Sequence, residues 1–419
     1  MKNLTAIILA AGQGKRIKPV VTPKPLLPFL GKPMINWIIN DLQSVGCKRF
    51  ILVVNPQDKD NFQSILPSAK HLEIVTQTKP AGMADAILTA QKKLTTSSMA
   101  VLNGDDLLSF KTYQQFAKNI KKHKSHPLMV GLKVDQHFSA AYFKLKANQI
   151  TGIVEKPAPG YEPSQYIKLV LDYFPQAKDF IDLLKKSHSK KDDHYEVTLD
   201  KFFKKTPTAL LVTDEYFAAL KYPWHILDVM QLCLKYYLKS SKSKSTQIHK
   251  TAVISGPVQI EPGVKIMANA VIKGPVYLGK NVTVANNALV RDSIIEEGSL
   301  VGYNTEIARS YVGPNNWFHC NFVGDSIIEA NSNLGSGARL ANLRFDDQEI
   351  KLKKAKQKLP TGKTKFGAVL GQRVKLGINT SIMPGITIGA NSIIGSGVVL
   401  NHSVKSNSKV YLKQQLIEK

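Results

Sequence analysis

The chain has 419 residues, of which 43% are hydrophobic, and it carries a formal net charge of +26 at pH 7. This length exceeds a single ordinary hydrophobic core, so we expect two domains, with a third possible, and the hydrophobic content excludes a disordered chain. The positive charge suits nucleic acid, acidic lipid or small anionic substrates alike. Because the sequence has no zinc-finger spacing, ribonucleoprotein motif or basic heptad region, a lysine-rich solvated surface is favoured over a nucleic-acid face.

The N-terminal apolar stretch LTAIILAA is too short for a membrane helix, and Gly12 follows it too soon for a signal peptide. The three cysteines, Cys47, Cys233 and Cys320, are scattered and form neither a disulfide framework nor a metal-binding C-x-x-C pattern. We therefore expect a cytoplasmic protein without a membrane segment, in which the cysteines are packing residues.

Residues 1–236 alternate short β-branched runs with longer mixed segments, as parallel strands joined by helices do. The expected strands are Ala6–Ala10, Arg49–Val54, Glu73–Gln77, Ala100–Asn103 and Pro127–Val134. Helices are expected over Met34–Val45 and Ala84–Lys93. The pattern predicts a Rossmann-like α/β domain whose sheet is covered on both faces.

Apolar residues recur at helical spacing over Trp224–Leu238, and the polar stretch KSSKSKST then predicts a linker over residues 237–248. In residues 249–419 aliphatic residues return at every sixth position. They are Ile254, Ile260, Ile266, Ile272, Leu278, Val284 and Val290, and in a second series Leu370, Leu376, Ile382, Ile388, Ile394 and Leu400.

This period predicts an all-β domain, a left-handed parallel β-helix of hexapeptide repeats, in which each aliphatic residue points into a triangular core. Gly and Asn recur between the repeats, as expected for tight corners that need positive φ. The alternative, a β-sandwich, would have irregular loops about every 8–12 residues instead.

A glycine-rich turn, LAAGQGKR, follows the first expected strand. Backbone N–H groups of Gly12–Arg16 can face phosphate oxygens there without obstruction by a Cβ atom. The turn is not a Walker loop and lacks the third glycine of a dinucleotide fingerprint, so it is weak evidence alone. Lys24, which stands between two prolines, strengthens the assignment of an anion site.

With the K-P dipeptide at Lys24 and the GKP turn after it, the sequence resembles the sugar-1-phosphate nucleotidylyltransferase family, whose signature is G-x-G-T-R. The resemblance covers essentially the whole chain. It implies that Arg16 and Lys24 are catalytic, hold the triphosphate of UTP or dTTP and stabilise charge at the α-phosphorus as a sugar 1-phosphate attacks. The implied nucleotide-binding residues of the turn are Ala10, Ala11, Gly12 and Gly14. The usual Thr is Lys15 here.

Further matches follow in the family's order. The segment QTKPAGMADAI resembles the one that reads the base, which implies this role for Gln77 and Gly82. The segment VLNGDDLL resembles the strand-end G-D motif, which implies Asp105 as the Mg²⁺ ligand. The alternative for Asp105 and Asp106 is a plain polar turn.

The sugar side also has its matches. GIVEKP resembles the family's E-K-P motif, so Glu155 would bind sugar hydroxyls and Lys156 the sugar phosphate. YEVTLD resembles a nearby E-x-x-T-D motif, which offers Glu196 as another hydroxyl acceptor. Phe143 replaces a glycine of the family, however, and an expected Asn and Gly are absent near Lys168 and Val170.

The second metal carboxylate of the family is missing, because Ala219 takes its place when Pro223–Trp224 is aligned, and alanine cannot ligate Mg²⁺. Two explanations stay open. Either the pocket is shifted and Asp214 or Glu215 takes the metal role, or the domain is degenerate and retains only nucleotide binding. The intact phosphate side favours activity.

The hexads are interrupted after Asn316 by a stretch that resembles the acetyltransferase centre of bifunctional UDP-N-acetylglucosamine pyrophosphorylases / glucosamine-1-phosphate acetyltransferases, the archaeal ones above all. The resemblance implies His319 as the base for a sugar amine that attacks acetyl-CoA, and Asn342 as a contact on the amine side. Asp325 and Asn333 lie in the matched scaffold. Such β-helices also imply a homotrimer.

This stretch departs from the pattern as well. Phe322 replaces a Tyr, while Ser336 and Ala338 alter a G-A-G-T motif. The basic segment Lys351–Lys365 matches a loop that the family extends from its β-helix. It is either an anion clamp for the phosphates of CoA or of the sugar, or a solvated hairpin.

The leading hypothesis is a bifunctional enzyme that acetylates glucosamine 1-phosphate and then uridylylates the product, N-acetylglucosamine 1-phosphate. One alternative is a monofunctional glucose-1-phosphate uridylyl- or thymidylyltransferase with a structural β-helix. Another is a non-catalytic regulatory subunit of the same architecture, which Ala219 and Phe143 favour. The set of Gly12–Arg16, Lys24, Asp105 and His319 argues against the regulatory subunit.

Overall fold

The computed structural model describes residues 3–66, 71–122, 125–147, 149–189, 191–354, 357–415 and 417. They form two compact units. The first comprises Met1–Gln13, Pro23–Leu26 and Pro33–Phe217, and the second comprises Gly14–Thr22, Leu27–Lys32 and Ala218–Lys419. Within the described ranges, no helix has both the length and the apolar character that crossing a membrane requires.

A nine-stranded sheet forms the centre of the first unit, in the order β5-β4-β1-β6-β11-β8-β12-β10-β9. Its strands are β1 (Leu4–Ala10), β4 (Arg49–Val54), β5 (Leu72–Thr76), β6 (Ser98–Asn103), β8 (Leu128–Lys133), β9 (Ala141–Lys146), β10 (Gln149–Glu155), β11 (Tyr166–Phe174) and β12 (Ala209–Thr213). The first four in this order, β5, β4, β1 and β6, run parallel, so their carboxyl ends share one edge of the sheet. Short strands β2 (Pro28–Phe29), β3 (Lys32–Pro33), β7 (Asp106–Leu108) and β13 (Phe217–Ala219) lie outside it.

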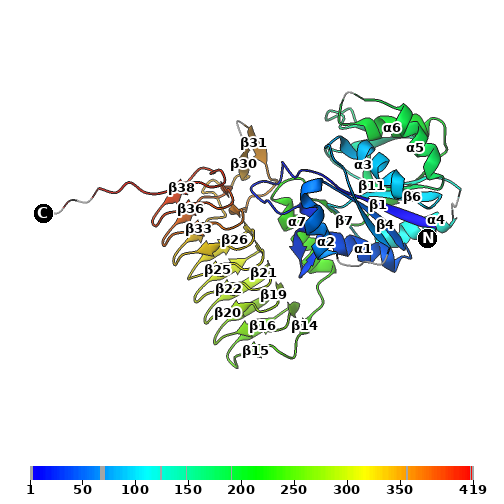
Figure 1. Ribbon diagram of the computed structural model, residues 1–419. Coiled ribbons are helices and arrows are strands. Elements are labelled where there is room, and N and C mark those ends of the chain that lie inside the picture. Colours follow the sequence, from blue (N-terminus) through cyan, green and yellow to red (C-terminus); the bar gives the residue numbers. More distant parts are fainter. Residues whose placement is uncertain are drawn as a thin grey trace. The chain divides into compact units, whose positions relative to one another are not determined.

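Helices cover both faces of this sheet (Figure 1). They are α1 (Met34–Ser44), α2 (Lys59–Ile65), α3 (Gly82–Ala90), α4 (Phe110–Lys122), α5 (Ala177–Lys186) and α6 (His194–Phe203). Alternate side chains of β1 enter different cores: Ile8 packs with α1 and α4, and Ile7 with α3, α5 and α6. Because β1 is covered on both sides, all its residues are apolar except Thr5, which is also buried. The predicted α/β fold is confirmed, with element ends that differ by a few residues.

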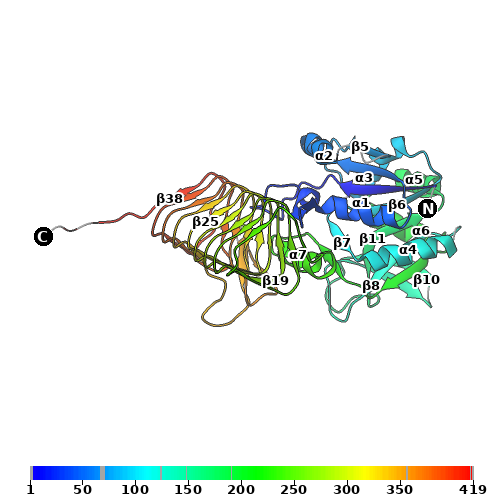
Figure 2. The same cartoon turned by 90° about the horizontal axis from the view of Figure 1, so that it is seen from below.

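The second unit contains α7 (His225–Tyr236) and a stack of short parallel strands, which Figure 2 shows coil upon coil. One face of the stack consists of β15 (Gln247–Ile248), β18 (Lys265–Ile266), β20 (Thr283–Val284), β22 (Leu300–Val301), β25 (Trp317–Phe318), β28 (Asn333–Leu334), β33 (Lys375–Leu376), β36 (Ile393–Ile394) and β38 (Lys409–Val410).

The other two faces join into one sheet, because β19 (Val271–Leu278) and β21 (Leu289–Ile295) run through a corner. The remaining strands of these faces are β14 (Ser241–Lys242), β16 (Val253–Ser255), β17 (Val258–Ile260), β23 (Glu306–Ala308), β24 (Tyr311–Val312), β26 (Phe322–Gly324), β27 (Ile327–Ile328), β29 (Arg339–Leu340), β32 (Val369–Leu370), β34 (Ser381–Ile382), β35 (Thr387–Ile388) and β37 (Val399–Leu400). The predicted division at residues 237–248 stays a prediction, and that segment contains β14 and β15.

The aliphatic residues of the hexads form the core of this β-helix. All the residues of both predicted series belong to one buried cluster, except Ile254. Ile254 is exposed, because it lies on β16 in the first coil, where only the next coil covers it. The hexapeptide β-helix that the period predicts is therefore confirmed.

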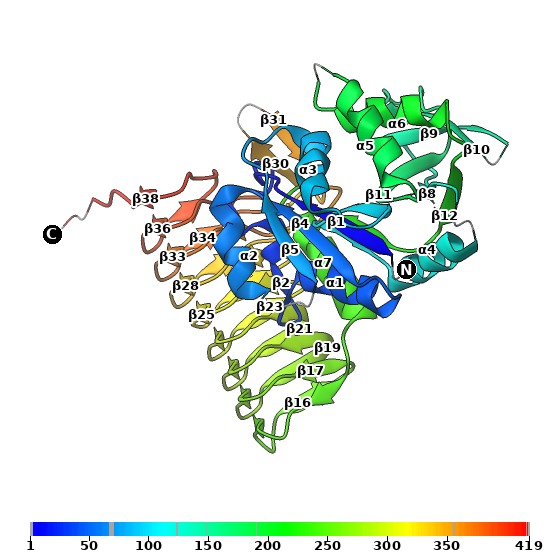
Figure 3. The ribbon, with the colours of Figure 1, turned by 45° about the vertical axis from the view of Figure 1, so that its right-hand side comes forward.

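A hairpin interrupts the coils without breaking their ladder. β29 pairs directly with β34, while β30 (Lys351–Lys354) and β31 (Gln357–Pro360) form an antiparallel pair that leaves the stack (Figure 3). Lys353 lies opposite Lys358, and both side chains are exposed. The basic segment is thus a hairpin, and its function as an anion clamp stays a prediction.

Candidate active sites

The glycine turn begins where β1 ends. Ala10 and Ala11 are buried, and a Cβ atom added to Gly12 would meet nothing within 4 Å, so the backbone there faces open space. Gly14 has a φ of 60°, a left-handed conformation that favours glycine. The amide of Ile17 donates to the carbonyl of Gly14 at 3.1 Å and closes the turn.

Gly104 brings the end of β6 close to the end of β1. Its N–H donates to the carbonyl oxygen of Leu9 at 2.9 Å, and an added Cβ atom would meet that oxygen at 3.2 Å. Asp105 therefore lies at the carboxyl edge of the parallel strands, where open α/β sheets bind ligands. Its carboxylate forms an ion pair with the Nζ of Lys24 at 2.8 Å. The structure thus brings together the predicted metal ligand and one predicted phosphate ligand.

The other carboxylates considered for a metal have different partners. Glu215 forms an ion pair with Lys111 at 2.5 Å and accepts a hydrogen bond from Ser109 at 3.3 Å. Asp214 is exposed. Among the described residues there is no group of three or more His, Cys, Asp or Glu side chains that could hold a metal ion.

Gln77 and Gly82, the predicted base-reading pair, are in contact. The Nε2 of Gln77 donates to the carbonyl of Gly82 at 3.0 Å and to the carboxylate of Asp85 at 2.8 Å. Gly82 has a φ of 80°, and a Cβ atom there would lie 2.6 Å from a carboxylate oxygen of Asp192. Asp85, which fixes the orientation of the Gln77 amide, was not identified from the sequence, because no motif marks it.

Glu155, Lys156 and Glu196 are close enough for their charges to interact. Glu155 ends β10 and forms an ion pair with Lys156, while Glu196 lies in the first turn of α6. Burial and, to a lesser extent, the charge of Glu155 raise the pKa of Glu196 to about 7, although the charges of Lys168 and Lys156 act in the opposite direction. These groups therefore share one local field.

A buried ion pair lies close enough to Glu196 to act on its pKa. Lys168 and Asp172, both on β11, approach to 2.6 Å, and their side chains are only 2% and 0% exposed. The hydroxyl of Tyr195 donates to Asp172 at 2.7 Å, and the Nζ of Lys168 lies 5.4 Å from the centre of the Tyr195 ring. Burial raises the pKa of Asp172. Sequence reasoning marked Lys168 only as a departure and missed its partners.

In the β-helix, His319 is exposed at the corner between β25 and β26. Its backbone N–H donates to the Oδ1 of Asn321 at 2.5 Å, and the Nδ2 of Asn321 donates to the carbonyl oxygens of Gly335 and Ala338 in the next coil. These hydrogen bonds fix the backbone that carries His319. His319 is thus exposed on a fixed backbone at the edge of the coil.

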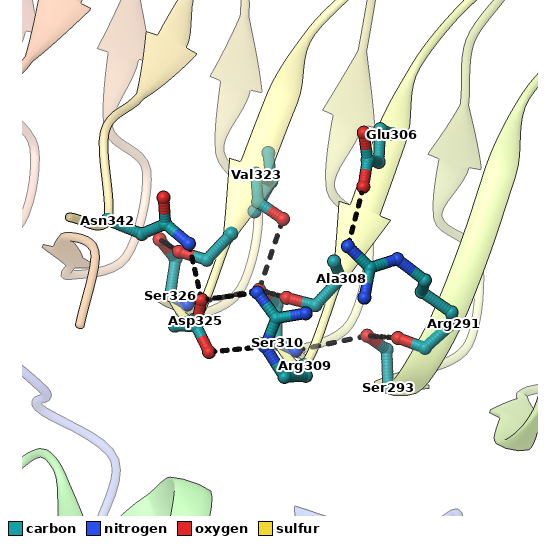
Figure 4. A network of polar contacts seen from close by, with 11 residues as sticks. Arg291, Ser293, Glu306, Ala308, Arg309, Ser310, Val323, Asp325, Ser326 and Asn342 are labelled. Atoms are coloured by element: carbon teal, nitrogen blue, oxygen red, sulfur yellow. Dashed lines mark hydrogen bonds and ion pairs between the residues drawn. The ribbon is translucent and has the colours of Figure 1, made fainter. Parts of the chain in front are cut away.

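Asn342 and Asp325 form a network at the next corner (Figure 4). The Nδ2 of Asn342 donates to Asp325 at 2.5 Å, and Arg309 makes two parallel bonds to the same carboxylate, each 2.7 Å long. Arg309 and Asp325 have φ values of 49° and 47°, so they occupy the same left-handed corner of successive coils. Strand β26 separates this network from His319, and Arg309 was not identified from the sequence.

Residues 5–252 match the family model described as nucleotidyl transferase, and residues 257–292 and 367–402 match the one described as bacterial transferase hexapeptide (six repeats). The chain is 32% identical over 427 residues to the bifunctional protein GlmU of Methanococcus vannielii, with 99% of each chain covered. It is 31% identical over 409 residues to the bifunctional sugar-1-phosphate nucleotidylyltransferase/acetyltransferase of Sulfurisphaera tokodaii, which covers 96% of this chain and 98% of that one.

A solved structure of UDP-glucose pyrophosphorylase complexed with UDP-glucose is also similar. It covers 56% of this chain and 99% of its own, with a TM-score of 0.49 and 18% sequence identity.

Proposed function

The chain belongs to the nucleotidyl transferase family, among the bifunctional sugar-1-phosphate nucleotidylyltransferases/acetyltransferases, and on this premise we propose its substrates and the residues that act on them. It is an enzyme with two transferase activities: transfer of a nucleotidyl group to a sugar 1-phosphate, and transfer of an acetyl group. The bifunctional relatives favour this interpretation over a monofunctional enzyme and over a regulatory subunit. We propose UTP, with dTTP as the alternative, and N-acetylglucosamine 1-phosphate as the substrates of nucleotidyl transfer.

The observation that carries the nucleotidyl-transfer proposal is the ion pair between Lys24 and Asp105 at the carboxyl edge of β1 and β6. The sugar-phosphate oxygen attacks the α-phosphorus in line, and pyrophosphate leaves. Lys24 and Arg16 stabilise the charge that develops on the phosphate oxygens, and the open backbone at Gly12 accommodates the phosphates. No covalent intermediate on the protein is required.

The family suggests a divalent metal, and we propose Mg²⁺. Asp105 fits this ion, since Mg²⁺ in nucleotide enzymes is commonly held by one or two carboxylates together with substrate phosphates. One carboxylate can therefore be enough, and Ala219 in the second position does not prevent Mg²⁺ binding. When bound, the ion would offset negative charge on the triphosphate. Lys24 would then give up its ion pair with Asp105 and contact the phosphates instead.

On the sugar side, Glu155 and Glu196 accept hydrogen bonds from the sugar hydroxyls, and Lys156 binds the sugar phosphate. In the β-helix, we propose acetyl-CoA as the acetyl donor and glucosamine 1-phosphate as the acceptor. His319 takes the proton from the amine as the nitrogen attacks the thioester carbonyl, and free CoA thiol leaves. Asn342, held by Asp325, contacts the amine side. A homotrimer and a cytoplasmic location stay predictions.

The test is to incubate the full chain with Mg²⁺, a panel of nucleoside triphosphates and sugar 1-phosphates, and acetyl-CoA, measuring pyrophosphate and free thiol. Asp105→Asn should lower pyrophosphate release on the order of a hundredfold, because it removes the charge at the edge of the sheet. His319→Ala should lower thiol release roughly a hundredfold or more, the size of a lost general base.

Two variants serve as controls. Asp106→Asn changes the neighbouring carboxylate, which accepts from Asn103 at 2.9 Å, and should leave pyrophosphate release near the wild-type rate. His402→Ala removes an exposed histidine from another coil and should leave thiol release unchanged. Absence of pyrophosphate with every substrate pair would overturn the nucleotidyl-transfer proposal. Absence of thiol with every amino sugar would overturn the acetyl-transfer proposal.

A further inference from the structure

Two glutamates at one corner of the β-helix are buried although corner positions of a coil normally face water. Glu296 follows β21 and Glu329 follows β27, and the two residues are only 1% and 3% exposed. Their own N–H groups donate to Val312 and Leu370 in the next coils, so their backbones belong to the ladder. What buries them is the early part of the chain, since Gly14–Thr22 and Leu27–Lys32 belong to the β-helix unit.

Glu329 is a carboxylate surrounded by hydrogen-bond donors. Its oxygens accept from the N–H of Val21 at 3.1 Å, and from the N–H and the hydroxyl of Thr22, each at 2.7 Å. Gln372, in the next coil, donates its N–H at 3.1 Å and its side-chain amide at 3.2 Å. A buried carboxylate is costly unless such donors compensate it, so this one holds the Val21–Thr22 backbone firmly.

Glu296 does the same for the second segment. It accepts from the N–H of Gly31 at 3.1 Å, and the hydroxyl of Tyr311 donates to the carbonyl of Pro28 at 3.0 Å. Gly31 has a φ of 73°, and a Cβ atom there would lie 2.3 Å from the Tyr277 hydroxyl oxygen. Only glycine fits this approach, which fixes the position of the segment on the coils.

The two anchored segments contain or flank the basic residues proposed to bind the triphosphate. Arg16 lies within Gly14–Thr22, Thr22 precedes Pro23–Lys24 directly, and Leu27 begins the second segment soon after. A lysine or arginine stabilises a transition state only when its charge is held at the developing charge, and displacement by about 1 Å costs up to a hundredfold in rate. The backbone on both sides of Lys24 therefore determines where its charge is held, and with it the rate of nucleotidyl transfer.

We propose that Glu296 and Glu329 of the β-helix are positioning residues for nucleotidyl transfer, which act by anchoring the backbone on either side of Lys24. The inference rests on the proposed nucleotidyl transfer. It makes the hexapeptide domain a structural part of the nucleotide half of the enzyme, in addition to its acetyltransferase function.

The test uses Glu329→Gln in the full chain. Glutamine keeps the shape but replaces one accepting oxygen with an NH₂ group, which faces N–H donors and repels them. We expect kcat/KM for the nucleoside triphosphate to fall roughly ten- to hundredfold. The KM for the sugar 1-phosphate and the rate of thiol release should stay within about twofold of wild type, because Glu155, Lys156, Glu196 and His319 lie outside the anchored segments.

Hydrogen exchange supplies a readout that does not depend on activity. The amides of residues 17–22 should exchange about tenfold faster or more in Glu329→Gln, while peptides of the β-helix core keep their protection. Glu261→Gln is the matched control: Glu261 follows β17 at the same corner of an earlier coil, where Gln259 donates to it at 2.8 Å. It should leave both readouts unchanged.

A second pair of variants tests the same contact from its other side. Thr22→Val removes the hydroxyl donor with almost no change of shape and should reproduce the loss, whereas Thr22→Ser keeps the donor and should retain activity. Unchanged exchange, or faster exchange with unchanged kcat/KM for the triphosphate, would overturn the inference. If wild type releases no pyrophosphate, the proposed function fails instead, and exchange alone still reports whether the anchor exists.

Discussion

Lys168 and Asp172 are buried charges beside the residues that we propose to bind the sugar. Removing two charges from water is costly, and their attraction offsets this cost only when geometry is close and other hydrogen bonds are made, as Tyr195 makes one to Asp172 here. The positive charge of Lys168 also favours ionisation of Glu196. Lys168 thus helps determine at which pH the neighbouring Glu196 becomes a carboxylate.

Glu196 should give substrate binding a pH dependence. Burial raises its pKa from 4.5 to about 7, so the carboxyl group is protonated at acidic pH in the folded chain. The ionised form accepts stronger hydrogen bonds from sugar hydroxyls. We expect the KM for the sugar 1-phosphate to fall as pH rises through about 7, and Glu196→Gln to lose this dependence. Because the sugar phosphate titrates equally in both proteins, only the difference between the two profiles is informative.

The same group affects stability. Between pH 4.5 and about 7 the folded chain binds a proton at Glu196 that the unfolded chain has released, so its contribution to the free energy of unfolding falls as pH rises across this window. Glu196→Gln, which is neutral throughout, should therefore gain stability relative to wild type over the same range. Identical pH profiles of KM and of the denaturation midpoint in the two proteins would contradict both expectations.

At the scale of elements, each hexapeptide strand places one aliphatic residue inside the coil and its neighbour outside. Corners between strands hold asparagines in left-handed conformation, as the sequence predicts. They are Asn269, Asn281, Asn287, Asn304, Asn315, Asn331, Asn379, Asn391 and Asn407. The combination of a fixed interval and a corner with positive φ defines the fold locally, coil by coil.

Strand β36 carries two neighbouring isoleucines, one on each side, whose contributions to stability test this pattern. Ile394 is fully buried in the coil, whereas Ile393 is only partly buried on the other side of the strand. Ile394→Ala should lower the stability of the β-helix by about 2–5 kcal/mol, and Ile393→Ala by clearly less, because only the first leaves a cavity. The measurement is the denaturant midpoint of this unit, followed by hydrogen exchange of its peptides. Equal losses would contradict the assignment of the coil interior.

At the scale of the whole molecule, the net charge of +26 matches the anionic substrates of both activities, since nucleotides, sugar phosphates and CoA all carry phosphate. Such a field raises association rates and is screened by salt, with a Debye length of about 30 Å at 0.01 M and 8 Å at 0.15 M. We therefore expect the surplus of lysine to act on substrate capture.

Salt should therefore weaken substrate capture. We expect kcat/KM for the nucleoside triphosphate to fall several-fold between about 0.01 and 0.15 M salt, with kcat changing much less, because screening acts on the encounter. The measurement is initial-rate kinetics at constant Mg²⁺ over that range. A fall in kcat with constant kcat/KM would show that salt acts on the bound complex instead, contrary to this expectation.

The sequence by itself determined the two kinds of fold, and it marked the residues that we propose for the phosphate side. A six-residue period and a β1 run that is apolar except for Thr5 indicate burial directly, and the residues around the glycine turn, Lys24 and Asp105 form compact motifs. The place of Asp105 follows from strand order, because the carboxyl ends of neighbouring parallel strands share an edge. Lys24 belongs to no strand of this sheet, so its ion pair with Asp105 comes from the tertiary structure.

Only the tertiary structure decided which side chains hold these motifs in place. In the sequence, Glu296 and Glu329 are ordinary corner residues of a hexad, and Asp172 is one more residue of a strand. Their partners, Gly31, Thr22 and Tyr195, belong to other elements, as far as 307 positions away for Thr22 and Glu329. Local patterns encode burial and turn conformation, whereas the choice of a hydrogen-bond partner depends on which distant segments the folded chain brings together.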